Sequence, residues 1–407
     1  MEKRKTPRIR FKGFSDDWEQ RKVGELLIER NEQAPMSIEY PLMAFIANEG
    51  VAPKGERYDR SSLVTDTENK LYKRTEFGDF IYSSNNLETG SIGLNKYGKA
   101  CISSVYSIFQ PTGIADSDFL GRRLVRKDFI NTMVKWRQGV IYGQWRIHES
   151  DFLKIEIPVP SLKEQRKIGI YLEGLDNLIT LHQRKLEKLK IIKKSMLENC
   201  FPKNGEKVPQ IRFSGFTNDW EQRKLGKLVA FSKGAGYSKG DLKENGTPII
   251  LYGRLYTKYE TVISDVDTFA DAKENSVYSK GGEVIVPASG ETTEDISIAS
   301  VVEKSGVLLG GDLNVITPAN GIDSAFLAIS ISNGKPHNDM AKMAQGKSVV
   351  HLHNLDLAKI DFPYPSYKEQ QKIRKYFSNL DHLITLHQSK LEKLQKIKKA
   401  LLERMFV

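Results

Sequence analysis

Residues 161–201 read SLKEQRKIGIYLEGLDNLITLHQRKLEKLKIIKKSMLENCF, and residues 366–406 read SYKEQQKIRKYFSNLDHLITLHQSKLEKLQKIKKALLERMF. The second stretch repeats the first at an offset of 205 residues. A shorter match lies upstream of each, with PRIRFKGFSDDWEQRKVGEL at 7–26 and PQIRFSGFTNDWEQRKLGKL at 209–228, offset by 202 residues. Because this period is several times longer than that of solenoid repeats, each copy is predicted to be a whole module.

The two longer repeats predict long helices. Ser161 with Glu164, and Ser366 with Glu369, fit the capping box at a helix start, and each stretch then continues for over thirty residues without proline. Apolar positions recur every 3.5 residues on average, with His182, Lys193, His387 and Lys398 as polar interruptions. This seam predicts a coiled coil between the copies. The residues predicted to pair the helices are Leu175, Ile179, Leu186, Leu189 and Met196 in the first copy, and Leu380, Ile384, Leu391, Leu394 and Leu401 in the second. An antiparallel arrangement would relate the halves by a pseudo-twofold axis.

Between the repeats the halves look unrelated. Residues 29–157 and 231–362 share only a general pattern of strands and turns. Because the repeated segments are similar and the inserts differ, we favour one architecture that carries two binding specificities. The alternative is a duplicated domain whose two copies have simply diverged in sequence. We predict a mixed α/β (α+β) fold with two similar globular recognition domains separated by two long antiparallel coiled-coil helices. The predicted divisions are 1–157 and 205–362 for the globular domains, and 158–204 and 363–407 for the helical regions.

Composition limits the environment and the partners. The chain has 407 residues and a net charge of +11, which favours a polyanionic partner, although basic proteins also bind membranes and acidic proteins. The two helical stretches hold 19 Lys/Arg and 9 Asp/Glu, so the globular inserts are nearly neutral. No run approaches the ~20 apolar residues that span a bilayer. The N-terminus lacks the apolar run of a secretion signal, and two cysteines are too few for a disulfide framework. These features predict a cytoplasmic protein without membrane contact.

Several fragments imitate catalytic motifs without completing them. The run Gly346-Lys347-Ser348 resembles the end of a P-loop, but Ala341 stands where the first glycine is needed. The run 361–364, DFPY, resembles the D-P-P-Y loop of amino-methyltransferases with one mismatch, and its counterpart EIPV at 156–159 indicates a link into the helix. No cysteine lies near the non-helical pair His351 and His353. We therefore predict no catalytic centre and no metal site.

If the polyanionic partner is a nucleic acid, its candidate contacts are polar, basic and aromatic residues on predicted loops, because base edges and phosphates are read by such groups. A solvated or structural role is the alternative for each. The candidates are Ser84, Asn85, Asn86, Tyr142, Gln144 and Arg146 in the first insert, and Tyr252, Arg254, Lys258, Gln345, Lys347 and His351 in the second.

The run IPVPSLKEQ at 157–165, followed by LDNLITLHQ at 175–183 and repeated as FPYPSYKEQ at 362–370, resembles the DNA-specificity (S) subunit of type I restriction–modification systems. The resemblance covers the whole chain. It implies that each recognition domain reads one half of a split, asymmetric target in double-stranded DNA. It implies also that the helices set the spacer and dock two methyltransferase (M) subunits, and that two restriction (R) subunits join for cleavage. S-adenosylmethionine, ATP and magnesium would then belong to those partners, with no cofactor on this chain.

Two other functions stay open from the residues alone. The chain could be a scaffold or tether in which the coiled coil is the working part and the inserts bind proteins. It could also be a nuclease or methyltransferase that acts alone, which the incomplete motifs argue against. Methyl transfer to DNA in the absence of other subunits would distinguish the last possibility.

Overall fold

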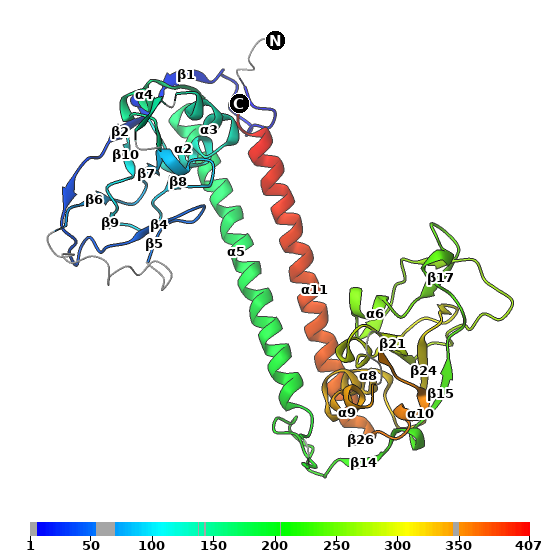
Figure 1. Cartoon of the computed structure of the whole chain (residues 1–407). Helices are drawn as coiled ribbons and strands as arrows, with labels where there is room; N and C mark the ends of the chain where they lie inside the picture. The colour runs from blue at the N-terminus through cyan, green and yellow to red at the C-terminus, as the bar shows by residue number, and fades with distance from the viewer. Residues whose placement is uncertain (1–5, 54–69, 137, 142–143, 204, 345–349) are drawn as a thin grey trace. The chain divides into compact units, whose positions relative to one another are not determined.

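The computed structural model describes residues 6–53, 70–136, 138–141, 144–203, 205–344 and 350–407, with only the backbone of 138–141 and 144–146 (Figure 1). The chain divides into two compact units. Unit 1 comprises Met1–His182 with Lys390–Val407, and unit 2 comprises Gln183–Ser389. Each unit therefore combines one globular domain with the first part of one long helix and the last part of the other.

The globular part of unit 1 is built from small antiparallel sheets and short helices. Its four-stranded sheet has the order β2-β10-β7-β8, with β2 Leu27–Glu29, β10 Ser107–Pro111, β7 Phe80–Tyr82 and β8 Ile92–Leu94. Smaller sheets pair β1 Glu19–Lys22 with β13 Glu156–Val159, β4 Ala44–Ile46 with β5 Gly50–Ala52, β11 Gln138–Ile141 with β12 Gln144–Arg146, and β3 Gln33–Ala34 with β6 Tyr72–Thr75 and β9 Ala100–Ile102. The helices are α1 Val23–Leu26, α2 Ser117–Leu124, α3 Lys127–Lys135 and α4 Glu149–Lys154, with the 3-10 turn η3 Ser84–Asn86.

An aromatic cluster holds these elements of unit 1 together. Phe152 of α4 is fully buried, and its ring centroid lies 4.7 Å from that of Phe109 and 4.9 Å from that of Tyr82. Trp18, from the first short repeat, is buried in the same core. Because such rings each bury a large apolar area, this cluster fixes α4 against strands β7 and β10.

The globular part of unit 2 uses larger sheets. A five-stranded sheet has the order β15-β24-β20-β22-β18, with β15 Val229–Lys233, β24 Leu313–Pro318, β20 Glu283–Pro287, β22 Ser300–Val302 and β18 Val262–Ile263. A four-stranded sheet has the order β16-β19-β17-β23, with β16 Leu242–Lys243, β19 Phe269–Ala270, β17 Thr247–Ile250 and β23 Leu308–Leu309. Two pairs join β14 Glu221–Lys224 to β26 Asp361–Tyr364 and β21 Ser289–Gly290 to β25 Val350–His351. The helices are α6 Arg254–Thr257, α7 Thr293–Ile296, α8 Ser324–Asn333, α9 Lys335–Met343 and α10 Asn354–Leu357, with the 3-10 turns η4 Leu225–Lys227 and η5 Lys239–Asp241.

The repeated segments of the sequence form the same elements in both units. The sequence EQRK forms β1 in unit 1 and β14 in unit 2, and each pairs antiparallel with the strand that leads into a long helix. In each unit an aspartate also caps a helix of the globular domain, α2 or α8: Asp116 accepts from Phe119 N, and Asp323 accepts from Ala325 N and Phe326 N. The predicted mixed fold with an internal repeat is confirmed, and the structure extends the repeat to helices α2 and α8, which the sequence did not reveal.

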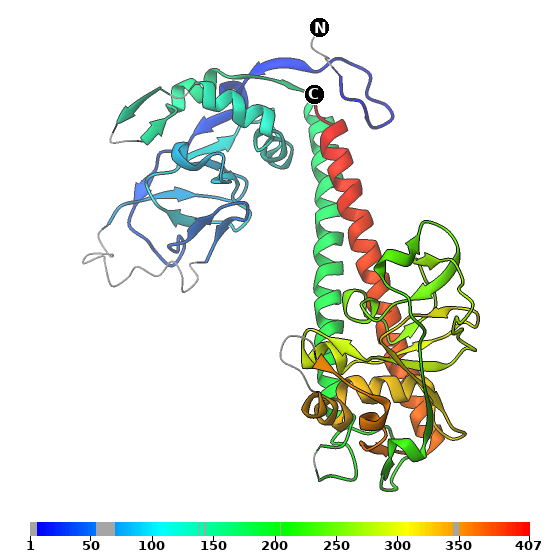
Figure 2. The same ribbon diagram turned by 45° about the vertical axis from the view of Figure 1, so that its right-hand side comes forward.

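The long helices are α5 Leu162–Asn199 and α11 Tyr367–Arg404, each 38 residues, or about 57 Å long. They lie side by side in both views (Figures 1 and 2). In unit 1, Leu394 and Leu401 near the end of α11 pack with the core that contains Leu175 of α5. In unit 2, Leu189 and Met196 near the end of α5 pack with the core that contains Leu380 of α11. The helices are therefore antiparallel within each unit.

Burial along the helices follows the 3.5-residue spacing. In the first seam Leu175 is buried, and Ile179, His182, Leu186, Leu189, Lys193 and Met196 are half-buried. In the second, Leu380 is buried, and Ile384, His387, Leu391, Leu394, Lys398 and Leu401 are half-buried. Among the described helices, none is long and apolar enough to cross a membrane.

The predicted capping boxes are wrong. The backbone N–H groups of Glu164 and Glu369 donate to the carbonyl oxygens of Ser161 and Ser366, each at 2.9 Å, and not to the serine hydroxyls. Both oxygens of Glu164 instead accept hydrogen bonds from the guanidinium of Arg10, at 2.7 and 2.8 Å. Glu369 does the same with Arg212, at 2.7 Å for each bond. The reason is burial, since each carboxylate is 1% exposed and a bidentate guanidinium stabilises a buried charge better than one backbone amide does. Because Arg10 lies in the short repeat, these contacts explain why the short and long repeats occur together.

Candidate nucleic-acid interface

In unit 1 the structure brings the two predicted loops together. The turn after β7 forms η3, and β12, the strand that pairs with β11, lies against it. The hydroxyl of Ser84 lies 3.3 Å from both the backbone N and the carbonyl O of Ile147, the residue after β12. Asn85 and Asn86 are exposed beside this junction. Tyr142 lies outside the described residues, as do the side chains of Gln144 and Arg146.

Unit 2 shows the same juxtaposition in different residues. Strand β21, just after β20, pairs antiparallel with β25, so that Ser289 faces His351. Leu352 N donates to Ala288 O at 3.0 Å, which closes the junction. The exposed ring of His351 stacks on that of His353, with centroids 6.4 Å apart and planes 6° apart. Gln345 and Lys347 lie outside the described residues.

Arg254 has an internal role instead of the predicted one. Its side chain is 8% exposed, and its guanidinium contacts Asp267 at 2.5 Å, Glu260 at 2.8 Å and the carbonyl of Asp265 at 2.9 Å. Lys258 contacts the same Asp267 at 2.7 Å, and hydrogen bonds from Lys258 and Arg254 lower the pKa of Asp267 to about 2. Reading a base would require these contacts to break, so we remove Arg254 from the candidate DNA contacts.

The third candidate from this segment is aromatic. Tyr252 packs edge-on against Tyr256, with ring centroids 6.1 Å apart. Tyr256, at 37% exposed, is the more accessible ring of the pair. A half-exposed tyrosine pair offers apolar surface and hydroxyls together, and both are features of nucleic-acid interfaces.

Sequence reasoning missed the two glutamines that attach the globular domains to the long helices. Gln165 Nε2 donates to Pro160 O at 2.9 Å, and its Oε1 accepts from Asp116 N at 3.0 Å. Gln370 repeats both bonds with Pro365 and Asp323, each at 2.9 Å. Identical polar residues at equivalent places in both halves were the available signal. They attach the start of each long helix to the first turn of α2 or α8.

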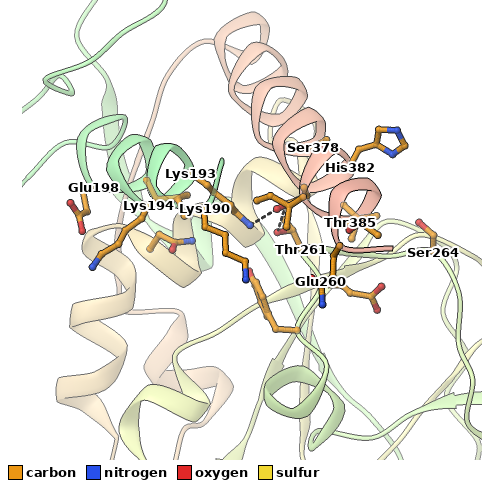
Figure 3. Close-up of a pocket in the computed structure, with 17 residues that line it drawn as sticks. Lys190, Lys193, Lys194, Glu198, Glu260, Thr261, Ser264, Ser378, His382 and Thr385 are labelled. Atoms are coloured by element: carbon orange, nitrogen blue, oxygen red, sulfur yellow. Dashed lines mark hydrogen bonds and ion pairs between the residues drawn. The ribbon is translucent and has the colours of Figure 1, made fainter. Parts of the chain in front are cut away.

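A cleft of about 890 Å³ lies elsewhere in unit 2, between the end of α5, residues 259–264 and the start of α11 (Figure 3). Three lysines of α5 line it, namely Lys190, Lys193 and Lys194. Lys193 forms an ion pair with Asp381 of α11, which is drawn in Figure 3. The described residues that line the cleft include none of the loops described above.

A second apolar stripe on the long helices is exposed. Leu178 and Leu181 of α5 are 45% and 47% exposed, and their equivalents Leu383 and Leu386 of α11 are 39% and 38% exposed. All four lie outside the seam that joins the helices. Repeated exposed leucines of this kind are typical of surfaces that another protein covers.

The described residues hold no group of three or more His, Cys, Asp or Glu side chains placed to bind a metal ion. Burial raises the pKa of Cys200 to about 11 and also raises the pKa of Cys101. Both thiols are thus protonated near neutral pH, and a protonated thiol is a poor nucleophile.

Comparison with known proteins gives consistent matches. The family model described as the type I restriction modification DNA specificity domain matches residues 15–191 and again 217–396. The type I restriction enzyme MjaVIII specificity subunit of Methanocaldococcus jannaschii is 23% identical over 408 residues, covering 95% of this chain and 91% of that protein. The putative type I restriction enzyme MjaX specificity subunit of the same organism is 24% identical over 278 residues, covering 64% and 60%.

A solved structure shares the fold. The S subunit of a type I restriction–modification system from M. genitalium superposes with a TM-score of 0.54 over 99% of both chains, at 16% sequence identity. At this identity the likeness concerns the fold alone.

Proposed function

Because the chain belongs to the type I restriction–modification DNA specificity family, we propose that each of its units reads one half of a bipartite, asymmetric target. The chain is the non-catalytic specificity component of such a complex, with DNA and the methyltransferase and restriction subunits as partners. The observation that carries the division into half-sites is the repeated junction. In unit 1 the turn after β7 contacts the segment before α4, and in unit 2 the turn after β20 contacts the segment before α10. The two junctions lie within the same repeated elements but have different side chains. Different side chains in equivalent places would read different bases.

Binding of the M–S complex to altered DNA tests this reading. With the methylated motif known, single base-pair changes in either half should each weaken binding by about 1–3 kcal/mol. Changes in the bases between the halves should have almost no effect if that segment is unread. Binding that responds to one half only would contradict two reading units.

We also infer that each long helix docks one methyltransferase subunit, giving two M subunits per chain. The exposed leucines at identical places in α5 and α11 support this, because one surface presented twice fits one partner bound twice. Replacing Leu178 and Leu181 by lysine should leave one M subunit bound, and replacing Leu383 and Leu386 should release the other. Ile191, which is 64% exposed and has no apolar equivalent in the second copy, provides the control Ile191→Lys. Native mass spectrometry gives the stoichiometry, and two bound M subunits in every variant would contradict the assignment.

The helices are further proposed to set the distance between the half-sites. Inserting seven residues after Leu189 and after Leu394 keeps the seam in phase and lengthens both helices by about 10 Å. The read bases should stay the same while the preferred spacer grows by about three base pairs, since DNA rises about 3.4 Å per pair. An unchanged spacer in an assembled complex would contradict this role.

The remaining expectations concern the complex. Two restriction subunits should join for cleavage, and S-adenosylmethionine, ATP and magnesium should bind the partner subunits and leave this chain without a cofactor. The complex would act in the cytoplasm, where its DNA substrate is accessible. Incubation of the purified chain with DNA and S-adenosylmethionine should give no methyl transfer until M subunits are added.

A further inference from the structure

Each seam contains a lysine that binds an aspartate on the other helix. Lys193 Nζ of α5 lies 2.5 Å from Asp381 Oδ1 of α11 (Figure 3), and Lys398 Nζ of α11 lies 2.5 Å from Asp176 Oδ1 of α5. The lysines are equivalent in the repeat, and so are the aspartates. The first pair belongs to unit 2 and the second to unit 1. A lysine in an apolar seam lowers the stability of a coiled coil, so its occurrence at both equivalent places calls for a role other than packing.

Both pairs specify the same register. Facing positions of an antiparallel helix pair have residue numbers that add to a constant, and both ion pairs give 574. A slip by one heptad in one direction would place Lys193 opposite Arg374 and Asp176 opposite Leu391. A slip in the other direction would place Lys193 opposite Gln388 and Asp176 opposite Met405. The apolar seam tolerates either slip, because it repeats every seven residues, whereas both ion pairs would be lost.

Each aspartate also contacts its globular domain. Arg122, at the end of α2, lies 2.8 Å from Asp176 Oδ2, and the hydroxyl of Thr261, just before β18, donates to Asp381 Oδ2 at 3.4 Å. Burial acts to raise the pKa of Asp176, but hydrogen bonds from Lys398 and Arg122 hold it below its usual value. Each aspartate thus joins three elements, namely both long helices and one globular domain.

We propose that the Asp176–Lys398 and Lys193–Asp381 pairs are positioning contacts that select one register of the helices and thereby one spacer length. This inference rests on the proposed role of the helices in setting the spacer. The ion pairs are proposed to act by favouring one register over the others, and not by adding to the stability of the chain. All four side chains are 23–34% exposed, and ion pairs with that access to water stabilise little.

Leucine at both lysine positions tests the proposal directly. The variant Lys193→Leu/Lys398→Leu should keep or gain thermal stability, because leucine packs in the seam. In cells that express it with M subunits, methylome sequencing should show sites whose spacers differ by about three base pairs from the native one. We expect these sites to be methylated at least about fivefold more than with the native chain. The control Lys194→Leu/Lys399→Leu changes the exposed neighbours and should keep the single native spacer.

Cysteine cross-linking reads the register without depending on the spacer. In a background with Cys101 and Cys200 replaced by alanine, Leu189→Cys/Ile384→Cys reports the native register, and Met196→Cys/Ile384→Cys reports a slip by one heptad. The lysine-to-leucine variant should increase the slipped cross-link.

The two experiments separate the possible failures. An unchanged cross-link and an unchanged spacer would overturn the proposal, as would a loss of stability with the native register kept. Slipped cross-links without new spacers would support the register assignment and refute the role of the helices in setting the spacer.

Discussion

The ion pair between Arg10 and Glu164 gives a sharp prediction about what holds the repeated frame together. Both carboxylate oxygens of Glu164 are bound by the guanidinium, at 2.7 and 2.8 Å. The glutamate side chain is 1% exposed and the arginine side chain 15%. In Arg10→Ala the carboxylate would remain buried without its counter-charge.

The magnitude follows from this burial. Removing one partner of a fully buried pair costs about 3–5 kcal/mol. Water can enter where the partly exposed arginine stood, so we expect a loss of about 2–3 kcal/mol for Arg10→Ala. Arg212→Ala should lower the stability of unit 2 equally, because Arg212 and Glu369 repeat the geometry and the exposure. The exposed Arg8 gives the control Arg8→Ala, expected to change stability by less than about 0.5 kcal/mol.

Hydrogen exchange measured by mass spectrometry in increasing urea provides the assay, because it reports the opening free energy of each unit separately. The double variant Arg10→Ala/Glu164→Leu removes both charges and should recover most of the loss. Single variants within about 0.5 kcal/mol of the native chain would refute the reasoning, as would a double variant no better than Arg10→Ala alone.

Three further predictions concern the loops, the helix contacts and the thiols. Arg146→Ala or Lys347→Ala should weaken DNA binding. Loss of a base contact costs about 1–3 kcal/mol and relaxes the specificity at one position of the target. Loss of a phosphate contact instead weakens binding to all sequences and lowers the salt dependence of binding. Unchanged binding by both variants would remove this assignment. Because the pKa of Asp176 is lowered in the folded chain, its contribution to stability is complete above the usual value of 3.8 and is lost as pH falls below it. The difference in unfolding free energy between the native chain and Asp176→Asn should therefore shrink in acid, and a difference that is constant with pH would contradict the pairing. Since burial raises the pKa of Cys200 to about 11 and also that of Cys101, a thiol reagent at pH 8 should label neither until urea unfolds the chain.

Periodic and repeated features could be read from the sequence because they depend on residues near one another in the chain. The seam is one case, since a 3.5-residue spacing of leucines needs no knowledge of the partner. The partner of Glu164 could not be read in this way, because Arg10 is 154 residues away and the serine three residues before the glutamate offered a local explanation. In the structure Glu164 is buried against Arg10, and this long-range ion pair forms in place of the local contact with the serine.

The candidate contacts show the same limit. Ser84 and the segment before Ile147 were selected separately, and their hydrogen bonds across 63 residues appear only in the fold. Arg254 was selected as a candidate DNA contact, although Glu260 and Asp267 follow within 13 residues and form its ion pairs, and the carbonyl of Asp265 accepts a further hydrogen bond. That local excess of acids was a signal available in the sequence. Which side chain contacts a base depends on how the DNA is bound, and the composition of the chain does not predict this.

Exchange of one insert tests the central claim most directly, namely that two units in one frame read two independent half-sites. Residues 29–157 would be replaced by the corresponding insert of a relative with a different target, and the hybrid expressed with its M subunit. Methylome sequencing should then show one half of the motif changed, with the other half and the spacer as before. A change in both halves, or in neither, from an assembled and active complex would contradict the account.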